Sequence, residues 1–304
     1  MREKNIKVNM FRVVGDLNPF VQVDYMDKYA EEHSGLMLLD SGSTVNILSR
    51  HMADQVSEQC IMKEESVDVL TITNDTVSTD SVRFSFVLGG LQNSERFSIC
   101  NEYQCEKVGD MPIIGILGNE FMQKNSLVID YSDYSFHTSE ISPTTLKCTD
   151  CDFFFPMEIG LENYGVPVIS IHQDGQDIVT MIDSGSADNI LSEIAINKYG
   201  VPCQIISKDN WIHGLSGSIK AKEAKVSFNI LNSCVDESET IPFEDYFVIF
   251  PCSLFNNKET NSKELPSIDG VIGSPFMARE GWILDFGAKI VYKQKEKTSY
   301  AKVV

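Results

Sequence analysis

The sequence lacks a long apolar run, and basic residues are few. No stretch approaches the roughly 20 consecutive apolar residues that cross a bilayer, so we expect no membrane partner. Lysine and arginine number 25 against 44 aspartates and glutamates, for a formal net charge of −19. Such a surface repels phosphate backbones, so we also expect no nucleic-acid partner. The simplest account of this acidity is solubility.

Histidines are also scarce: there are five, beside eight cysteines. Cys148 and Cys151 form a C-x-x-C pair in a polar segment. That pair lacks the second cysteine pair, or the nearby histidines, that a tetrahedral zinc site needs. We therefore expect no metal and no cofactor. The even number of cysteines permits disulfides without requiring them in a chain of 304 residues.

The start of the sequence does not have the pattern of a signal peptide. The positive charge near Met1 is not followed by an apolar segment. We expect a cytoplasmic protein, or a secreted or periplasmic one if a signal peptide has been removed. The chain does have 42% hydrophobic residues, a globular composition with enough apolar side chains for two modest cores.

One four-residue motif, Asp-Ser-Gly-Ser, occurs twice, beginning at Asp40 and at Asp183. Each copy follows an apolar run and precedes Asn-Ile-Leu-Ser, which begins at Asn46 and at Asn189. A given tetrapeptide of this kind arises by chance on the order of once in ten thousand positions or less. The shared flanking residues therefore indicate an internal duplication.

The pattern of apolar and polar residues around both motifs predicts short strands, hairpins and small helices. In the first half we expect helices at 49–59 and 119–124, a hairpin over 67–77, and strands at 20–25, 35–39, 82–88, 97–99 and 127–131. In the second half we expect a helix at 192–199 and strands at 166–172, 177–182, 226–231, 246–250 and 283–286.

These elements predict a mostly β fold of two similar lobes related by a pseudo-two-fold axis. Residues 1–140 would form the first lobe and 153–304 the second. A polar stretch at 141–152 would be the linker.

An aspartate that directly follows a buried strand on a Ser-Gly-Ser turn is held at the edge of the core. A two-fold arrangement would bring Asp40 and Asp183 together at the axis. Two carboxyl groups that share a site hold one proton over a broad pH range. One can then activate a water while its protonated partner polarises a carbonyl. That is the chemistry of peptide hydrolysis without a metal or a covalent intermediate.

The two Asp-Ser-Gly-Ser motifs and the segments downstream of them resemble those of the retropepsin-like aspartic proteases. The first half has Ile-Leu-Gly-Asn-Glu-Phe-Met at 116–122 and Val-Ile-Asp-Tyr at 128–131. The second half has Asp-Gly-Val-Ile-Gly-Ser-Pro-Phe-Met at 269–277 and Ile-Leu-Asp-Phe at 283–286. The resemblance implies an internally duplicated single chain with two β-barrel lobes. It also implies a monomer that cuts an extended peptide or protein substrate.

By position, the resemblance implies that Asp40 and Asp183 are the catalytic pair. It implies that the hydroxyls of Ser41 and Ser184 cross-link the two turns.

The rest of each turn supports the pair in the same scheme. Gly42 and Gly185 would give close backbone access. Ser43 and Ser186 would donate hydroxyl hydrogen bonds to the ionised carboxylate and lower its pKa. We therefore expect a pH optimum shifted toward acid.

The resemblance also places two flaps over the bound peptide, at hairpins that differ in sequence between the halves. The cleft should therefore be asymmetric and read a peptide in one direction. The expected flap residues are Ile72, Thr73, Asn74, Gly214, Leu215, Ser216 and Gly217.

Two classes of function remain open. One is an active aspartic endopeptidase; the other is a peptide-binding module with weak or absent turnover on the same fold. Two carboxylates at the axis favour catalysis, because peptide binding alone does not require them. Asp130 and Asp285 end strands in their halves and are interpreted as structural, and Phe276 as a packing residue.

Overall fold

The computed structural model describes residues 6–13, 16–56, 62–70, 76–100, 107–139, 151–159, 165–214, 217–232, 240–251 and 267–295. The first half contains β1 (Lys7–Asn9), β2 (Phe11–Val13), β3 (Asp16–Met26), β4 (Glu32–Asp40), β5 (Ile47–Ser49), α1 (Arg50–Gln55), β6 (Met62–Leu70), β7 (Thr76–Leu88), β8 (Leu91–Cys100), β9 (Lys107–Val108), β10 (Met111–Gly118), α2 (Asn119–Lys124), β11 (Leu127–Asp130) and β12 (Ser135–Thr138).

The second half repeats much of this order. It contains β13 (Cys151–Pro156), β14 (Glu158–Ile159), β15 (Pro167–Gln173), β16 (Gln176–Asp183), β17 (Ile190–Ser192), α3 (Glu193–Tyr199), β18 (Cys203–Gly214), β19 (Gly217–Leu231), β20 (Thr240–Phe250), β21 (Gly270–Gly273), α4 (Ser274–Glu280), β22 (Ile283–Asp285) and β23 (Ile290–Gln294).

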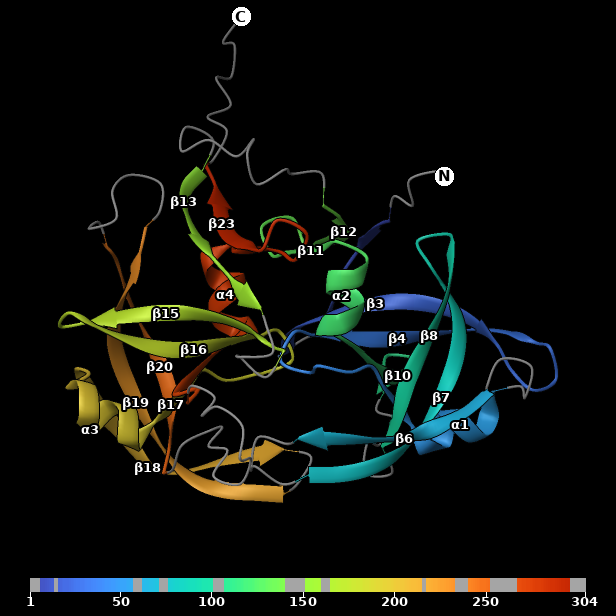
Figure 1. Ribbon diagram of the computed structural model, residues 1–304, viewed down its shortest axis with the longest axis horizontal. Helices are drawn as coiled ribbons and strands as arrows, with labels where there is room; N and C mark the ends of the chain where they lie inside the picture. Colours follow the sequence, from blue (N-terminus) through green and yellow to red (C-terminus); the bar gives the residue numbers. More distant parts are fainter. Residues whose placement is uncertain are drawn as a thin grey trace, which may run out of the picture.

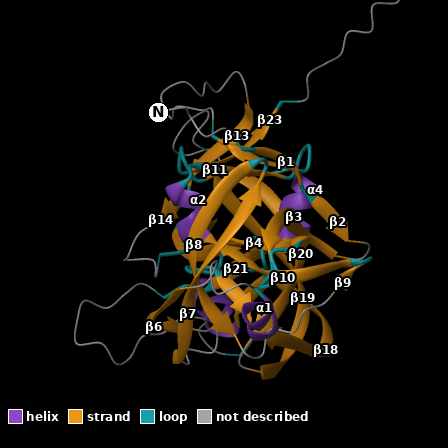
Figure 2. Cartoon of the chain, turned by 90° about the vertical axis from the view of Figure 1, so that its right-hand side faces the viewer, coloured by secondary structure: helices purple, strands orange, loops and turns teal. Residues whose placement is uncertain are grey.

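Each half builds its own sheet, and the two lobes lie side by side (Figure 1). The first half forms a nine-stranded sheet in the order β2-β3-β4-β10-β5-β8-β7-β6, with β9 on β10. The second half forms an eight-stranded sheet in the order β14-β15-β16-β21-β17-β20-β19-β18. Strands dominate and the helices are short in the second view as well (Figure 2). The predicted mostly β fold of two lobes with short helices is confirmed.

A third sheet joins the halves. It has six strands in the order β1-β12-β11-β22-β23-β13, so three come from each half. At its centre β11 pairs with β22 in antiparallel fashion, with Ile129 opposite Leu284. Every residue of both strands is buried. This accounts for their continuous apolar pattern, because such strands have no solvent face.

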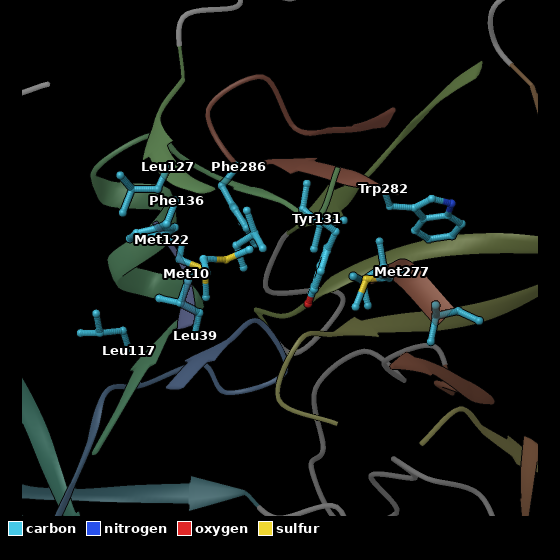
Figure 3. Packing of buried hydrophobic residues seen from close by; sticks show 14 of the residues in the cluster. Met10, Leu39, Leu117, Met122, Leu127, Tyr131, Phe136, Met277, Trp282 and Phe286 are labelled. Carbon is cyan, nitrogen blue, oxygen red and sulfur yellow. The ribbon is translucent and has the colours of Figure 1, made fainter. Parts of the chain in front are cut away.

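The main hydrophobic core extends through both lobes. Figure 3 shows Leu39 and Leu117 from the first half, Met277 and Trp282 from the second, and Tyr131 between them. The four apolar side chains have no exposed surface, and that of Tyr131 is almost fully buried. Since apolar burial contributes about 25 cal/mol per Å², this shared core stabilises the position of one lobe against the other.

Several predicted elements have different bounds in the structure. The first helix, α1, ends at Gln55 and is capped by Ser49, whose hydroxyl accepts a hydrogen bond from Met52 N. The hairpin predicted over 67–77 is present as β6 and β7, with Leu70 opposite Thr76, but its turn lies outside the described residues. Residues 141–150 of the expected linker also lie outside them, and β13 begins at Cys151. The proposed lobe boundaries stay a prediction.

The helices of the described residues are six or seven residues long. Within that part of the chain, none is long and apolar enough to cross a membrane.

Candidate active site

The two Asp-Ser-Gly-Ser motifs form two turns that meet between the lobes. β4 and β16 each run parallel to a glycine-ended strand, so Asp40 lies opposite Gly118 and Asp183 opposite Gly273. Each aspartate is therefore the last residue of a strand held on one side by β10 or β21. This shared register explains why both turns project to the same place.

Hydrogen bonds from buried serines connect the two turns. Ser41 Oγ accepts from Ser184 N at 2.9 Å and donates to Ile182 O at 2.8 Å. Ser184 Oγ accepts from Ser41 N at 2.9 Å and donates to Leu39 O at 2.7 Å. Both serines are fully buried. The structure thus contains the cross-link that the resemblance implies for Ser41 and Ser184.

Each aspartate packs against the glycine of the opposite turn. A Cβ atom built on Gly42 would lie 2.5 Å from Asp183 Cγ, and one on Gly185 would lie 2.5 Å from Asp40 Cγ. No side chain fits at these distances, so the close approach of the carboxyl groups requires glycine in both turns. These reciprocal contacts bring Asp40 and Asp183 together at the axis.

The two carboxyl groups form a coupled pair. Burial raises the pKa of Asp40 well above its usual range, and the charge of Asp183 and the hydrogen bond between them raise it further. Burial also raises the pKa of Asp183, but the hydrogen bond from Asp40 and backbone N–H donors hold it down. Both residues keep some exposed surface, so a substrate can reach them. This environment favours one shared proton, held on the Asp40 side.

The backbone donors to Asp183 come from both turns. They are the N–H groups of its own turn and one from the opposite turn: Gly185, Ser186 and Gly42. The Gly185 bond is 2.9 Å long. Donors that face a carboxylate stabilise its ionised form. Asp183 is therefore the better placed of the two aspartates to carry the negative charge.

The expected role of the second serine in each turn is wrong in its hydrogen-bond partner. Ser43 Oγ donates to Val45 O at 2.8 Å, and Ser186 Oγ donates to Asp188 O at 2.7 Å. These hydroxyls shape the chain after each turn instead of donating to a carboxylate. The contribution of Ser43 to Asp40 is its backbone N–H, at 3.0 Å from Oδ1. The expected acid shift of the optimum loses this support, and burial of the pair acts in the opposite direction.

The structure explains why Asn-Ile-Leu-Ser follows each Asp-Ser-Gly-Ser motif. Asn46 Oδ1 accepts from Gly118 N at 2.9 Å, and Asn189 Oδ1 accepts from Gly273 N at 2.9 Å. Each asparagine thus fixes the strand that lies beside its own Asp-Ser-Gly-Ser turn. The repeated asparagine in the sequence was the available signal for this role.

In the second half the asparagine also contacts a charged pair, whose counterpart in the first half is the ion pair of Lys124 and Glu95, 2.8 Å apart. Asn189 Nδ2 donates to Asp245 Oδ2 at 2.7 Å, and Asp245 Oδ1 accepts from Arg279 Nη1 at 2.8 Å. Asp245 is buried, so this partner offsets the cost of removing its charge from water. Sequence reasoning missed Asp245 and Arg279, because 34 residues separate them.

Only part of the expected flap residues can be placed. Ile72, Thr73, Asn74, Leu215 and Ser216 lie outside the described residues. Gly214 and Gly217 lie opposite each other at the end of the hairpin formed by β18 and β19.

Asp130 and Asp285 both bind their own turns. Asp130 Oδ1 accepts from Ser132 N at 2.8 Å, and Asp285 Oδ1 accepts from Ala288 N at 2.8 Å. Ser139 Oγ also donates to Asp285 Oδ2 at 2.7 Å. Phe276 is fully buried and packs against other aromatic rings. These contacts agree with the structural interpretation of all three residues.

Two other groups of residues bear on the expectation of no metal. Asp27, Glu31 and His33 place possible ligand atoms within 4.8 Å of one another. Asp27 already accepts from the backbone N–H groups of Tyr29 and Glu31 and contacts the His33 ring, so the group stabilises its own turn. Of the C-x-x-C pair, only Cys151 is described, and its side chain is buried.

The serine cross-link gives a stability prediction. Ser41→Ala and Ser184→Ala each leave a buried N–H and a buried carbonyl without their partner, which costs about 1–3 kcal/mol for each group. Because two groups are affected, we expect each variant to lose about 2–6 kcal/mol of free energy of unfolding in urea titrations. Ser34→Ala is the control, because Ser34 Oγ bonds only at the surface, to Asp24 Oδ1 at 2.6 Å. Equal losses in all three variants would contradict the cross-link.

The raised pKa of Asp40 gives a second stability prediction. A group whose pKa is raised by folding stabilises the protein fully below its unfolded pKa, about 3.9 for aspartate, and loses that contribution as the pH rises through the folded pKa. Stability of the wild type should therefore decline above about pH 4. In Asp40→Asn the decline should be smaller, measured as free energy of unfolding against pH. Parallel curves for the two proteins would contradict the assignment.

Comparisons with known proteins identify the fold. No family model matches the chain, and no curated protein matches it in sequence. It is similar in structure to the aspartic proteinase from Irpex lacteus, with a TM-score of 0.56 and 11% identity over 98% of this chain and 99% of that chain. It is also similar to basic 7S globulin from soybean, with a TM-score of 0.51 and 11% identity over 97% of each chain.

These matches extend over nearly the whole of both lobes. The protein therefore has the two-lobed, pepsin-like fold of aspartic proteases.

Proposed function

We propose that this protein is an aspartic endopeptidase of the retropepsin-like kind, with both halves in one chain. One observation carries the proposal: each of two carboxyl groups packs against the glycine of the other's turn, 2.5 Å from where a Cβ would lie. A fold can keep its shape without such an arrangement. Peptide hydrolysis needs it, because one group must accept a proton while the other donates one.

The surroundings of the pair assign the two roles. Asp183 has backbone donors from both turns and acts as the base, while Asp40 holds the shared proton. Asp183 takes a proton from a water as the water oxygen bonds to the peptide carbonyl carbon, and Asp40 gives its proton to the carbonyl oxygen. The tetrahedral diol then collapses. Asp183 protonates the leaving nitrogen, Asp40 takes a proton from the diol, and the starting state is restored.

The proposed substrate is an extended peptide or protein segment that binds across the two turns. The reaction uses the two side chains and a water, so it needs no cofactor. We further propose that the protein acts as a monomer, since both halves of the site come from one chain.

A peptide-binding module is the second candidate. The chain shares its fold with a soybean protein whose name is that of a globulin. A fold of this class therefore does not by itself establish catalysis.

Cleavage of a diverse peptide library between pH 3 and 8 distinguishes the two candidates. The wild type is compared with Asp40→Asn and Asp183→Asn, and products are identified by mass spectrometry. An endopeptidase gives defined products with the wild type and none with either variant. Peptide binding without products in all three proteins would support the binding module instead.

A further inference from the structure

The two halves differ behind the catalytic turns, at positions that the duplication makes equivalent. Tyr131 N donates to Trp282 O at 3.0 Å, and Phe286 N donates to Leu127 O at 2.9 Å. Tyr131 and Phe286 therefore occupy matching places in the two halves. Tyrosine stands in one half and phenylalanine in the other, so only one side has a hydroxyl.

A second pair of equivalent positions also differs. Asn119 N donates to Ser43 O at 2.7 Å, and Ser274 N donates to Ser186 O at 3.0 Å, so each begins the helix that lies next to its own turn. The side chains have different partners. Ser274 Oγ donates to Ser184 O at 2.6 Å, whereas the Asn119 amide donates to Gly165 O, in the other half.

The tyrosine and the serine are in contact. Tyr131 Oη and Ser274 Oγ lie 2.6 Å apart, and both residues are almost fully buried. Ser274 has one hydroxyl proton and uses it on the Ser184 carbonyl, which can only accept. Tyr131 must therefore be the donor to Ser274. The direction of the chain is fixed: Tyr131 to Ser274 to Ser184 O.

The last peptide group in this chain contacts the catalytic pair. The carbonyl of Ser184 belongs to the same peptide group as Gly185 N–H, which donates to Asp183 Oδ1 at 2.9 Å. A hydrogen bond accepted at a peptide carbonyl polarises the group and strengthens its N–H as a donor, by perhaps 10–30% per bond. The tyrosine hydroxyl therefore acts on Asp183 without contacting it.

We propose that Tyr131 and Ser274 are positioning residues that act through the Ser184–Gly185 peptide group to keep Asp183 as the base of the pair. This inference rests on the proposed function. It adds that the two halves are not equivalent: Asp183 is stabilised through Ser274 of its own half, and Tyr131 of the first half is the donor to that serine. Phe286 and Asn119 provide no matching chain to Asp40.

Among the described residues, few titratable groups lie near Asp183. Asp40 lies across the axis, and Tyr131 lies beneath the turn, where burial raises the pKa of its hydroxyl and keeps it a donor. Tyr134, in the adjoining turn, also raises the pKa of Tyr131, and the centroids of their rings lie 6.0 Å apart. Asp188 follows the turn, and its pKa is raised by burial and then by the charge of Glu223. Removing the hydroxyl of Tyr131 thus tests one donor without adding a charge.

The test uses Tyr131→Phe, Ser274→Ala and the double variant, with Tyr134→Phe as the matched control. Tyr131→Phe should move the acid limb of the kcat/KM–pH profile upward by about half a unit, and Ser274→Ala by up to about one unit. At a pH below the limb, these shifts reduce kcat/KM by about three-fold and ten-fold. The double variant should equal Ser274→Ala alone, because Tyr131 reaches Asp183 only through Ser274.

A second readout separates this inference from the proposed function. Carboxyl-carbon NMR follows the ionisation of Asp183 directly, with its signal assigned by comparison with Asp183→Asn, and needs no substrate. The same graded shifts should appear even if no peptide is cut. An unchanged titration of Asp183 in Tyr131→Phe and Ser274→Ala would overturn the proposed hydrogen-bond chain. Additive shifts in the double variant would overturn it as well. If the wild type cuts no peptide but these shifts are observed, only the proposed function is overturned.

Discussion

Asp183→Asn and Asp40→Asn should each reduce kcat/KM by about 10³-fold or more, without loss of the fold. Asparagine cannot take a proton from water or donate one to a carbonyl oxygen, and general acid–base catalysis contributes about 10²–10⁴-fold. The variant with both substitutions should be no worse than either alone, because the two aspartates act as one unit. The measurement is peptide cleavage on the best library substrate.

Asp130→Asn is the matched control for this result. Asp130 is also an aspartate at a strand end, but its Oδ1 accepts hydrogen bonds from Ser132, and asparagine retains an acceptor oxygen. Its activity should stay within about two-fold of the wild type, as for a change that leaves the reacting groups in place. Retained cleavage in Asp183→Asn or Asp40→Asn would exclude the paired mechanism.

Gly42→Ala should inactivate the protein by displacing an aspartate on the other turn. The added methyl would lie 2.5 Å from Asp183 Cγ, far inside van der Waals contact. Asp183 must therefore move, and a shift of about 1 Å at a reacting group costs about 10²-fold in rate. Gly185→Ala should do the same to Asp40, by the reciprocal contact. The measurement is kcat/KM, together with thermal unfolding to show that each variant is folded.

Ser43→Ala tests whether the effect is specific to the glycine. It changes the adjacent residue of the same turn, but the hydroxyl that it removes bonds to Val45 O. Its loss of activity should be much smaller than that of Gly42→Ala. Equal losses in the two variants would show that any change in this turn disrupts the site, and would contradict the reciprocal packing.

The duplication made much of the site predictable. Asp-Ser-Gly-Ser in two matched settings placed Asp40 and Asp183 at strand ends, and the structure has them at the ends of β4 and β16. Local pattern sufficed because a strand and the turn after it are neighbours in sequence. The same holds for Ser49 and Ser192, which cap α1 and α3.

Individual hydrogen-bond partners were harder to predict from the sequence, both within a turn and between distant segments. Ser43 precedes Val45 by two residues, yet the sequence did not show that its hydroxyl would bond to the Val45 carbonyl and not to Asp40. The partner of Tyr131 is Ser274, 143 residues away, and no short-range pattern connects them. The central sheet likewise combines strands from both halves, which only the folded chain reveals. Such contacts depend on how the lobes pack, and periodicity carries no information about that.

The shared proton of the catalytic pair is the claim on which the account depends most. A difference proton titration measures it directly, by comparing the wild type with the Asp40→Asn/Asp183→Asn double variant. We expect the wild type to release two more protons, in two well-separated steps, with the upper step clearly above the ordinary aspartate value of about 3.9. Release of both extra protons together near that value would contradict the account, because the two carboxyl groups would then be independent.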